Sequence, residues 1–287
     1  MSITLGGATS QNLLALQNIN TQLDTTQNHL ATGLAVASAT DDAVKYFQSQ
    51  SLNARASDLT TRKDAISQGI SSLTAATNGI TGVIAILQQM EGVVNGASTQ
   101  TAAQRASAAT QFNTLGQQLT TLLGDSSYQG LNLVNATTSN LTLQFSQTST
   151  STLKITGQNL VFSKLVTGGK ALAKGSKAAT LLISLKFSAV SNKISVFSNA
   201  YNALQTAVFK AQAAAQTLGT NVNFLQTRLS FTENYISTLQ GGASNLTVAD
   251  LNQESTNLVT LQTRQQLAIQ SLSIATSSEQ AVLRLFH

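Results

Sequence analysis

Very few residues in this chain could take part in acid–base or metal chemistry. Of its 287 residues, two are histidine and none is cysteine. The histidines, His29 and His287, stand near opposite ends of the chain, and no His-Glu-x-x-His zinc motif occurs. His29 lies beside Leu30 in a helical pattern, which favours a surface or interface role. We therefore expect no enzyme activity, no metal site and no cofactor.

Two other groups contain residue types that are used in chemistry, but their surroundings favour other roles. Asp41 and Asp42 could form a carboxylate pair, yet they stand where a helical pattern begins and suit the positive end of a helix dipole. Gly168-Gly169-Lys170 lacks the rest of a phosphate-binding loop and follows no clear strand-to-helix pattern. We predict that Asp41 and Asp42 mark a helix start.

The strongest pattern is an apolar heptad repeat between residues 245 and 287, in which eight of eleven seam positions are apolar. One seam position holds Leu251, Leu258, Gln265, Leu272, Glu279 and Phe286, and the other holds Glu254, Leu261, Ala268, Ala275 and Val282. A similar stripe near the N-terminus contains Leu13, Leu16, Ile19, Leu23, Leu30 and Leu34.

Helices this rich in Thr, Ser and Gln are marginal alone, so both stripes need partners. We expect the two chain ends to pack together and to join other molecules on assembly. The residues predicted for this assembly are Leu16, Leu23, Leu30, Leu251, Leu258, Leu261, Leu272 and Phe286.

Between the two ends, the pattern predicts longer helices and a short β region. The absence of proline permits very long helices, expected over 42–97, 101–123 and from 192 onward. Gly241-Gly242 is expected to break the last of these helices. Period-two alternation over 141–145 and 153–155 predicts a β-hairpin.

The fold class is therefore mainly α: long antiparallel coiled-coil-like helices from both chain ends, with a β-hairpin and a small β- or loop-rich middle module. The predicted segments are an N-terminal helix (1–40), longer helices with the hairpin (41–160), a short middle module (161–191), a further long helix (192–242) and a C-terminal helix (243–287).

Charge is sparse and uneven. Only 9% of residues are charged, which is low for a soluble monomer and suggests a surface that is covered in an assembly. Residues 126–232 hold nine basic and no acidic residues (+9), whereas the flanks hold seven basic and eleven acidic residues (−4), which accounts for the net charge of +5. The N-terminus has neither the basic start nor the apolar run of a signal peptide, and no long apolar run predicts membrane insertion.

The basic middle has two interpretations. It could be a solvated surface that keeps assembled copies apart, or it could attract acidic polysaccharide, phage or host surfaces. We expect no nucleic acid partner, because aromatic residues rarely interleave with the basic ones. The residues predicted for this basic surface are Lys164, Lys170, Lys174, Lys177 and Lys186.

Several motifs resemble those of bacterial flagellin. Leu30-Ala-Thr-Gly33-Leu followed by Ser38-Ala-Thr-Asp41-Asp42-Ala43 is similar to the family's L-S-S-G-x-x-I-N-S-A-x-D-D-A block. Tyr128-Gln-Gly-Leu131 resembles the F-N-G-x that precedes the family's hairpin. The spacing of Asp250, Asn252, Glu254 and Leu258 resembles D-x-A-x-E-x-x-x-L, and Ile269-Gln-Ser-Leu272-Ser-Ile-Ala275 resembles the closing helix. The resemblance covers about 1–160 and 190–287.

This resemblance implies a subunit of the helical flagellar filament. The terminal helices (1–40 and 243–287) would form its inner core, the longer segments (41–160 and 192–242) its outer core, and 161–191 a short variable surface module. It also implies export through the flagellar channel without a cleaved signal peptide, and partners that include an export chaperone, junction proteins and a cap protein. In the family, the segment L-Q-R-V-R-E-L is recognised by the vertebrate innate flagellin receptor. Here the corresponding residues are Leu87-Gln-Gln-Met-Glu-Gly-Val93, so both arginines are absent and this recognition is not expected. The alternatives are a hook–filament junction protein and a flagellin-like adhesin for acidic glycans.

Overall fold

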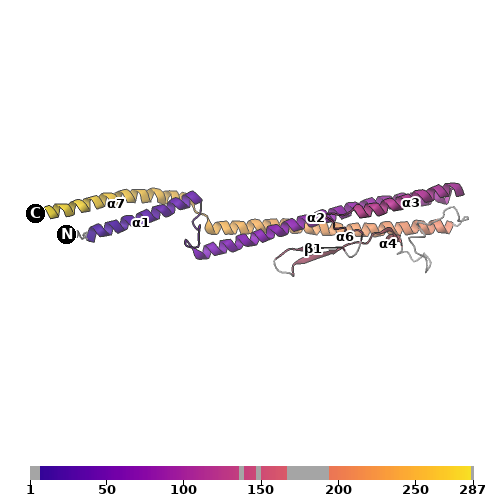
Figure 1. Cartoon of the computed structure of the whole chain (residues 1–287), viewed down its shortest axis with the longest axis horizontal. Helices are drawn as coiled ribbons and strands as arrows, with labels where there is room; N and C mark the ends of the chain where they lie inside the picture. The colour runs from indigo at the N-terminus through magenta and orange to yellow at the C-terminus, as the bar shows by residue number, and fades with distance from the viewer. Residues whose placement is uncertain (1–6, 136–138, 147–149, 167–193, 286–287) are drawn as a thin grey trace. The chain divides into compact units, whose positions relative to one another are not determined.

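The computed structural model describes residues 7–135, 139–146, 150–166 and 194–285. In chain order its elements are α1 (Gly7–Thr32), α2 (Ala43–Ser98), α3 (Ala102–Asp125), β1 (Asn140–Gln144), β2 (Thr152–Thr156), α4 (Phe162–Val166), α6 (Ile194–Thr247) and α7 (Leu251–Leu285) (Figure 1). The expected fold class is confirmed: long helices at both ends and one antiparallel hairpin. Most of the predicted middle module, 161–191, lies outside the described residues.

The chain forms two compact units, each built from segments far apart in sequence. The first unit combines residues 1–57 with 237–287, and the second contains residues 58–236. In the first unit α1 and α7 lie antiparallel, side by side (Figure 1). The two ends of the chain therefore make one helical hairpin.

The second unit has a continuous apolar core between α2, α3 and α6. Ile66, Leu73, Ile80 and Leu87 follow one another at intervals of seven on α2 and are fully buried, as the heptad spacing predicts. Phe112 of α3 packs edge-on against Phe162 of α4, with ring centroids 6.3 Å apart. This core excludes water along α2 and so supports a helix that would be marginal in isolation.

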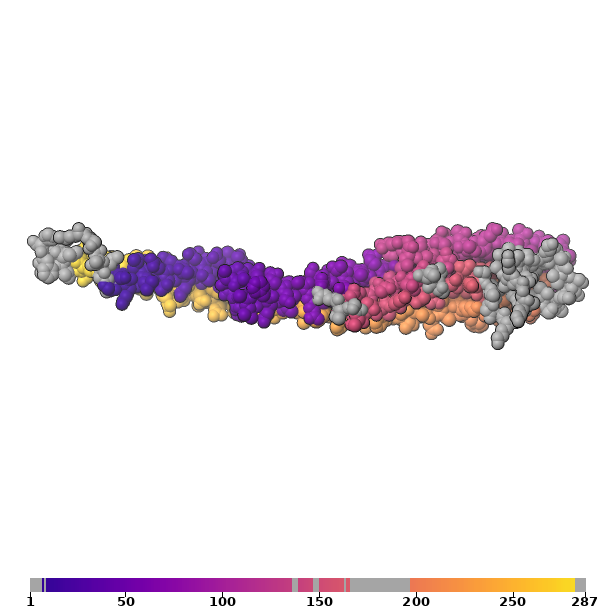
Figure 2. All heavy atoms as spheres, turned by 60° about the horizontal axis from the view of Figure 1, so that its bottom comes forward, coloured from indigo at the N-terminus to yellow at the C-terminus, as the bar shows by residue number. Residues whose placement is uncertain are grey.

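The β-hairpin covers one side of this core. Leu143 faces Leu153 and Leu141 faces Ile155 in antiparallel register, and Leu143, Phe145 and Ile155 are buried. In Figure 2 the hairpin, in pink, lies beside the orange surface of α6. The alternation of buried and exposed residues that predicted the hairpin thus places its apolar face on the helices.

The glycines within α2 differ in how much space a side chain would have. A Cβ atom at Gly79 would lie 2.2 Å from Oγ of Ser126, and one at Gly82 would lie 2.7 Å from a methyl carbon of Leu122. A Cβ atom at Gly92 would meet nothing within 4 Å. Gly79 and Gly82 therefore permit close packing of α3 and the residue after it, whereas Gly92 only weakens the helix.

The expected break at Gly241-Gly242 is wrong, because α6 continues through both glycines to Thr247. Each glycine costs about 1 kcal/mol in a helix, which packing can offset. The helix instead ends where Val248 forms a bridge with Leu34. Backbone pairing with a distant segment, rather than local glycine content, sets this boundary.

Helix α2 is long and apolar enough to cross a membrane by length and composition alone, and 39% of its most apolar window is buried inside the protein. The buried residues Ile80, Val83 and Leu87 belong to the core of the second unit. A core helix meets the same criteria as a membrane span, so this feature is explained by packing.

Candidate assembly interface

The packing of α1 against α7 follows a heptad spacing on both helices. On α7, buried and half-buried side chains recur at alternating steps of four and three residues: Glu254, Leu258, Leu261, Gln265, Ala268, Leu272, Ala275 and Glu279. These are predicted seam positions, and Leu261 is the most buried of them at 8% exposure. Leu251, also predicted for the seam, is 49% exposed. Phe286 lies outside the described residues.

The α1 seam is more polar than the apolar stripe predicted. Its positions are Thr9, Asn12, Leu16, Ile19, Leu23, Thr26 and Leu30. Leu16, Leu23 and Leu30 lie in this seam as expected, whereas Leu13 is 38% exposed and lies outside it. A search for apolar residues cannot find the three polar seam residues, although continuing the steps of three and four from Leu16 would have found them.

Polar side chains at both ends of the seam find partners on the opposite helix. Nδ1 of His29 lies 3.0 Å from Oε1 of Glu254, with the two side chains 21% and 17% exposed. At the far end the hydroxyl of Thr9 donates to Glu279. Between them, Nε2 of Gln265 donates to Oδ1 of Asn20 over 2.7 Å. A half-buried polar group without a hydrogen-bond partner destabilises the folded state. These pairs therefore allow polar residues in the seam without that loss of stability.

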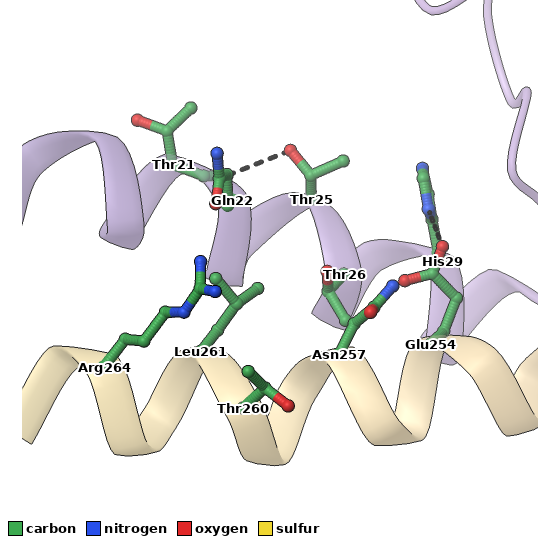
Figure 3. Close-up of a pocket in the computed structure, with 10 residues that line it drawn as sticks. All are labelled: Thr21, Gln22, Thr25, Thr26, His29, Glu254, Asn257, Thr260, Leu261 and Arg264. Atoms are coloured by element: carbon green, nitrogen blue, oxygen red, sulfur yellow. Dashed lines mark hydrogen bonds and ion pairs between the residues drawn. The ribbon is translucent and has the colours of Figure 1, made fainter.

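One flank of the α1–α7 hairpin is hollowed into a polar groove of about 430 Å³ (Figure 3). His29 and Glu254 close one end of the groove, while Arg264 reaches toward Gln22 at the other. The sides are mostly Thr, Asn and Gln, and none of the described residues forms a group of three or more metal-binding side chains. The groove is therefore lined mainly by uncharged polar side chains, with His29, Glu254 and Arg264 as its titratable residues.

At the base of the hairpin, the segment that follows α1 forms backbone hydrogen bonds with the segment that joins α6 to α7. Gly33 has φ of +71° and its N–H donates to the carbonyl of His29 over 2.8 Å, which ends α1. The carbonyl of Gly33 accepts from Ala249 N–H at 3.0 Å, and Ala35 N–H donates to Thr247 at 2.8 Å. This pairing brings the end of α1 next to the start of α7.

The predicted helix-start residues, Asp41 and Asp42, have different roles. Oδ1 of Asp42 accepts the N–H of Lys45 at 3.0 Å, so Asp42 caps α2, whereas Thr40 or Asp41 was the expected cap. Asp41 instead accepts three hydrogen bonds, from the N–H groups of Ala37 and Ser38 and from the Ser38 hydroxyl. The bond from the Ser38 N–H is the main cause that lowers the pKa of Asp41 below its ordinary value. Asp41 thus closes the turn before the helix.

The outer faces of the hairpin carry many large apolar side chains. Among the described residues of α1 and α7, those exposed by more than half are Leu14, Val259, Leu267, Ile269 and Ile274. Leu267 and Ile274 are seven residues apart and so share one face of α7. Contiguous exposed apolar residues on a helix mark a surface that another protein covers.

Of the residues predicted for a basic surface, the structure describes only Lys164, which is exposed on α4. Its carbonyl and that of Leu165 accept hydrogen bonds from Nζ of Lys210, at 3.5 and 3.1 Å. Lys170, Lys174, Lys177 and Lys186 lie outside the described residues.

Comparison with known proteins assigns the family. Residues 4–139 match the bacterial flagellin N-terminal helical region, and residues 201–286 match the bacterial flagellin C-terminal helical region. The chain belongs to the bacterial flagellin family. It is 30% identical to flagellin FljO of Caulobacter vibrioides over 96% of this chain and 95% of that protein. It is 25% identical to a flagellin of Brucella melitensis over 96% and 97% of the two chains.

Among solved structures, the chain is similar to a crystal structure of Bacillus cereus flagellin, with a TM-score of 0.46 and 19% identity over 58% of this chain and 88% of the other. The family matches show a structural filament subunit, and they give no support to a junction protein or an adhesin.

Proposed function

We propose that the α1–α7 hairpin carries polymerisation, and that its outward apolar residues are covered by the hairpins of neighbouring subunits. The observation that supports this proposal is the exposure of Leu267 and Ile274, 62% and 65%, on one face of α7. Burial of an apolar side chain of this size stabilises a contact by about 1.5–3 kcal/mol. A face repeated along the filament gains this energy in every subunit.

The seam leucines act earlier, by holding the hairpin together. Leu16, Leu23, Leu30, Leu258, Leu261 and Leu272 join α1 to α7 within one chain. Polymerisation then requires an ordered hairpin, so these residues belong to inner-core assembly as well. Leu251 and Phe286, at the two ends of the α7 stripe, are proposed to contact neighbours.

The proposed organisation assigns 1–40 and 243–287 to an inner core, 41–160 and 192–242 to an outer core, and 161–191 to the variable outer surface. A filament made by adding subunits head to tail is open, because heterologous contacts that do not close form a helix. The subunit is proposed to act outside the cell, after export without cleavage, with chaperone, junction and cap proteins as further partners.

Two apolar-to-acidic substitutions test the polymerisation surface. Leu267→Asp and Ile274→Asp should abolish filaments seen by electron microscopy while leaving the helical content of the monomer unchanged, since exposed substitutions alter folding stability by about 0.5 kcal/mol or less. Gln266→Asp and Ser273→Asp add the same charge at adjacent exposed positions and serve as matched controls. Filaments of normal length from both apolar-site variants would contradict the proposal.

Limited proteolysis tests ordering on assembly. In dilute monomer, a protease should trim about the first and last forty residues, because a solitary two-helix hairpin opens readily. In filaments the same ends should resist cleavage. Equal trimming in both states would show that assembly does not protect the hairpin.

A further inference from the structure

Two asparagine residues of α2 precede a glycine, and the chain has no other Asn-Gly pair. The pairs are Asn78-Gly79 and Asn95-Gly96, both within the helix. Asparagine is a thermolabile residue, and it loses its side-chain amide most readily before glycine, which has no side chain to shield its backbone nitrogen. A β-branched residue precedes each pair, so a difference in their reactivity would come mainly from the structure.

The first pair is held in the middle of α2. The side chain of Asn78 is exposed, but Gly79 is buried, and a Cβ atom there would lie 2.2 Å from Oγ of Ser126. The next residue, Ile80, is fully buried in the core. In a helix the N–H of Gly79 bonds to the carbonyl four residues before it. Its nitrogen is therefore released only when the middle of α2 unfolds.

The second pair lies in the last turn of the same helix, which ends at Ser98. Asn95 and Gly96 are both exposed, and a Cβ atom at Gly96 would meet nothing within 4 Å. In a regular helix the carbonyl of Gly92 accepts the Gly96 N–H, and Gly92 also has open space around it. Two glycines so near the end weaken this turn, and helix ends fray more readily than helix centres. Local opening of a single turn therefore releases the nitrogen of Gly96.

We infer that Asn95 is a site of spontaneous deamidation in the folded protein, and that the same reaction is blocked at Asn78. The backbone nitrogen of Gly96 attacks Cγ of Asn95 and forms a new C–N bond. The bond from Cγ to Nδ2 breaks, and the proton of the Gly96 amide leaves with Nδ2 as ammonia. Water, the only co-reactant, then opens the five-membered succinimide. Attack of water on Cγ gives aspartate, and attack on the backbone carbonyl carbon gives isoaspartate.

Either product should loosen the end of α2. A carboxylate at position 95 would stand four residues after Glu91, and like charges at this spacing destabilise a helix. It would also lie at the negative end of the helix dipole. Isoaspartate lengthens the main chain by one carbon and so interrupts the helical hydrogen bonds. Val94 and Ala97, which are fully buried in this turn, would then lose part of their packing.

Peptide mapping of the incubated protein tests the inference, because both sites fall in one tryptic peptide. No Lys or Arg lies between Lys63 and Arg105, so residues 64–105 are released together. After incubation of the folded full-length chain in mildly alkaline buffer, fragment ions should place at least tenfold more of the amide-to-acid mass gain at Asn95 than at Asn78. The same incubation in concentrated urea should bring the two rates to within about twofold of each other, because unfolding releases both nitrogens.

Substitutions at the two sites provide matched controls. Gly96→Ala places its methyl group in open space, so it should keep the fold and slow deamidation of Asn95 at least fivefold. Asn95→Asp should lower the urea midpoint of the second unit, whereas Asn78→Asp, with no acidic residue one turn away, should lower it less. Equal deamidation of Asn95 and Asn78 in the folded protein, or a rate at Asn95 that Gly96→Ala does not reduce, would overturn the inference. An unchanged midpoint for Asn95→Asp would overturn the expected effect on α2.

Discussion

Nδ1 of His29 and Oε1 of Glu254 lie 3.0 Å apart although the two residues are 225 positions apart in sequence. The contact joins the last turns of α1 to the first turn of α7, just above the backbone pairing of Leu34 with Val248. This polar pair ends the α1–α7 seam at the base of the terminal hairpin. The contact also gives His29 an interface role, one of the two roles that its helical pattern predicted.

Removal of either partner should loosen the base of the hairpin. Glu254→Ala and His29→Ala should each destabilise the hairpin by about 1–3 kcal/mol, because a half-buried polar group loses its partner. The double variant should lose less than the sum of the two, which a double-mutant cycle on filament dissociation would measure. Gln253→Ala, at an exposed neighbouring position, is the control and should have little effect. Strict additivity of the two substitutions would mean that the pair contributes nothing.

The two classes of glycine in α2 should respond in opposite directions to alanine. Gly79→Ala should destabilise the second unit by about 1–3 kcal/mol, because its Cβ would lie 2.2 Å from Oγ of Ser126. Gly92→Ala meets open space and should stabilise α2 by up to about 1 kcal/mol. Urea unfolding of both variants gives the comparison. A Gly79→Ala variant that is as stable as the parent, or more stable, would show that the close approach of Ser126 to Gly79 relaxes without cost.

Glu91 should make the second unit less stable as pH rises. Burial raises the pKa of its carboxyl above the ordinary value, and Oε1 is buried without a hydrogen-bond partner. The folded protein therefore holds this proton more tightly than the unfolded chain does, so the contribution of Glu91 to stability falls as pH rises through that range. Glu91→Gln should raise the melting temperature at pH 7, and the difference from the parent should shrink toward pH 4.

The exposed Glu233→Gln substitution is the control for this pH dependence. It removes one acidic charge from an exposed site and so separates the effect of net charge from that of burial at Glu91. A Glu91→Gln variant that is less stable than the parent at pH 7 would show that the charged carboxylate has a favourable partner.

The turn after α3 should be improved by asparagine. Gln129 has φ of +49° and Gly130 has φ of +80°, and the flanking Tyr128 and Leu131 exchange backbone hydrogen bonds of 3.0 and 2.9 Å. Such a turn needs positive φ at both central positions, where asparagine followed by glycine is favoured. Gln129→Asn should stabilise the second unit by a few tenths of a kcal/mol, and Gly130→Ala should cost about 1–2 kcal/mol in thermal unfolding. A neutral Gly130→Ala would contradict the requirement for positive φ.

Reversal of charge in the basic middle should leave polymerisation intact. Changing Lys164, Lys170, Lys174, Lys177 and Lys186 to Glu alters each charge by −2 and shifts the formal net charge from +5 to −5. We expect normal filaments, because these positions lie outside both terminal stripes, and a reversed electrophoretic mobility of the filaments. Loss of assembly would place the module at a contact between subunits.

Local spacing in the sequence was enough to predict the long helices, the hairpin strands and the α7 seam. Leu258, Leu261 and Leu272 could be assigned to one stripe because a helix repeats every 3.6 residues whatever it packs against. Asp41 and Asp42 could be assigned to a helix start because acidic side chains favour the positive end of a helix dipole, which involves only the first turn. The motifs around Asp41 and Leu258 then sufficed for the family, since they lie in order at the two ends of the chain.

Only the tertiary structure decided which polar residues enter the seam and where α6 ends. The pairing of His29 with Glu254 depends on the alignment of two helices that are 225 residues apart, which no local pattern contains. Helix α6 passes through Gly241-Gly242 because packing offsets a local cost of about 1 kcal/mol per glycine. Phe224 stands beside the buried Leu225, and only the position of neighbouring helices determines which of two adjacent apolar residues faces water.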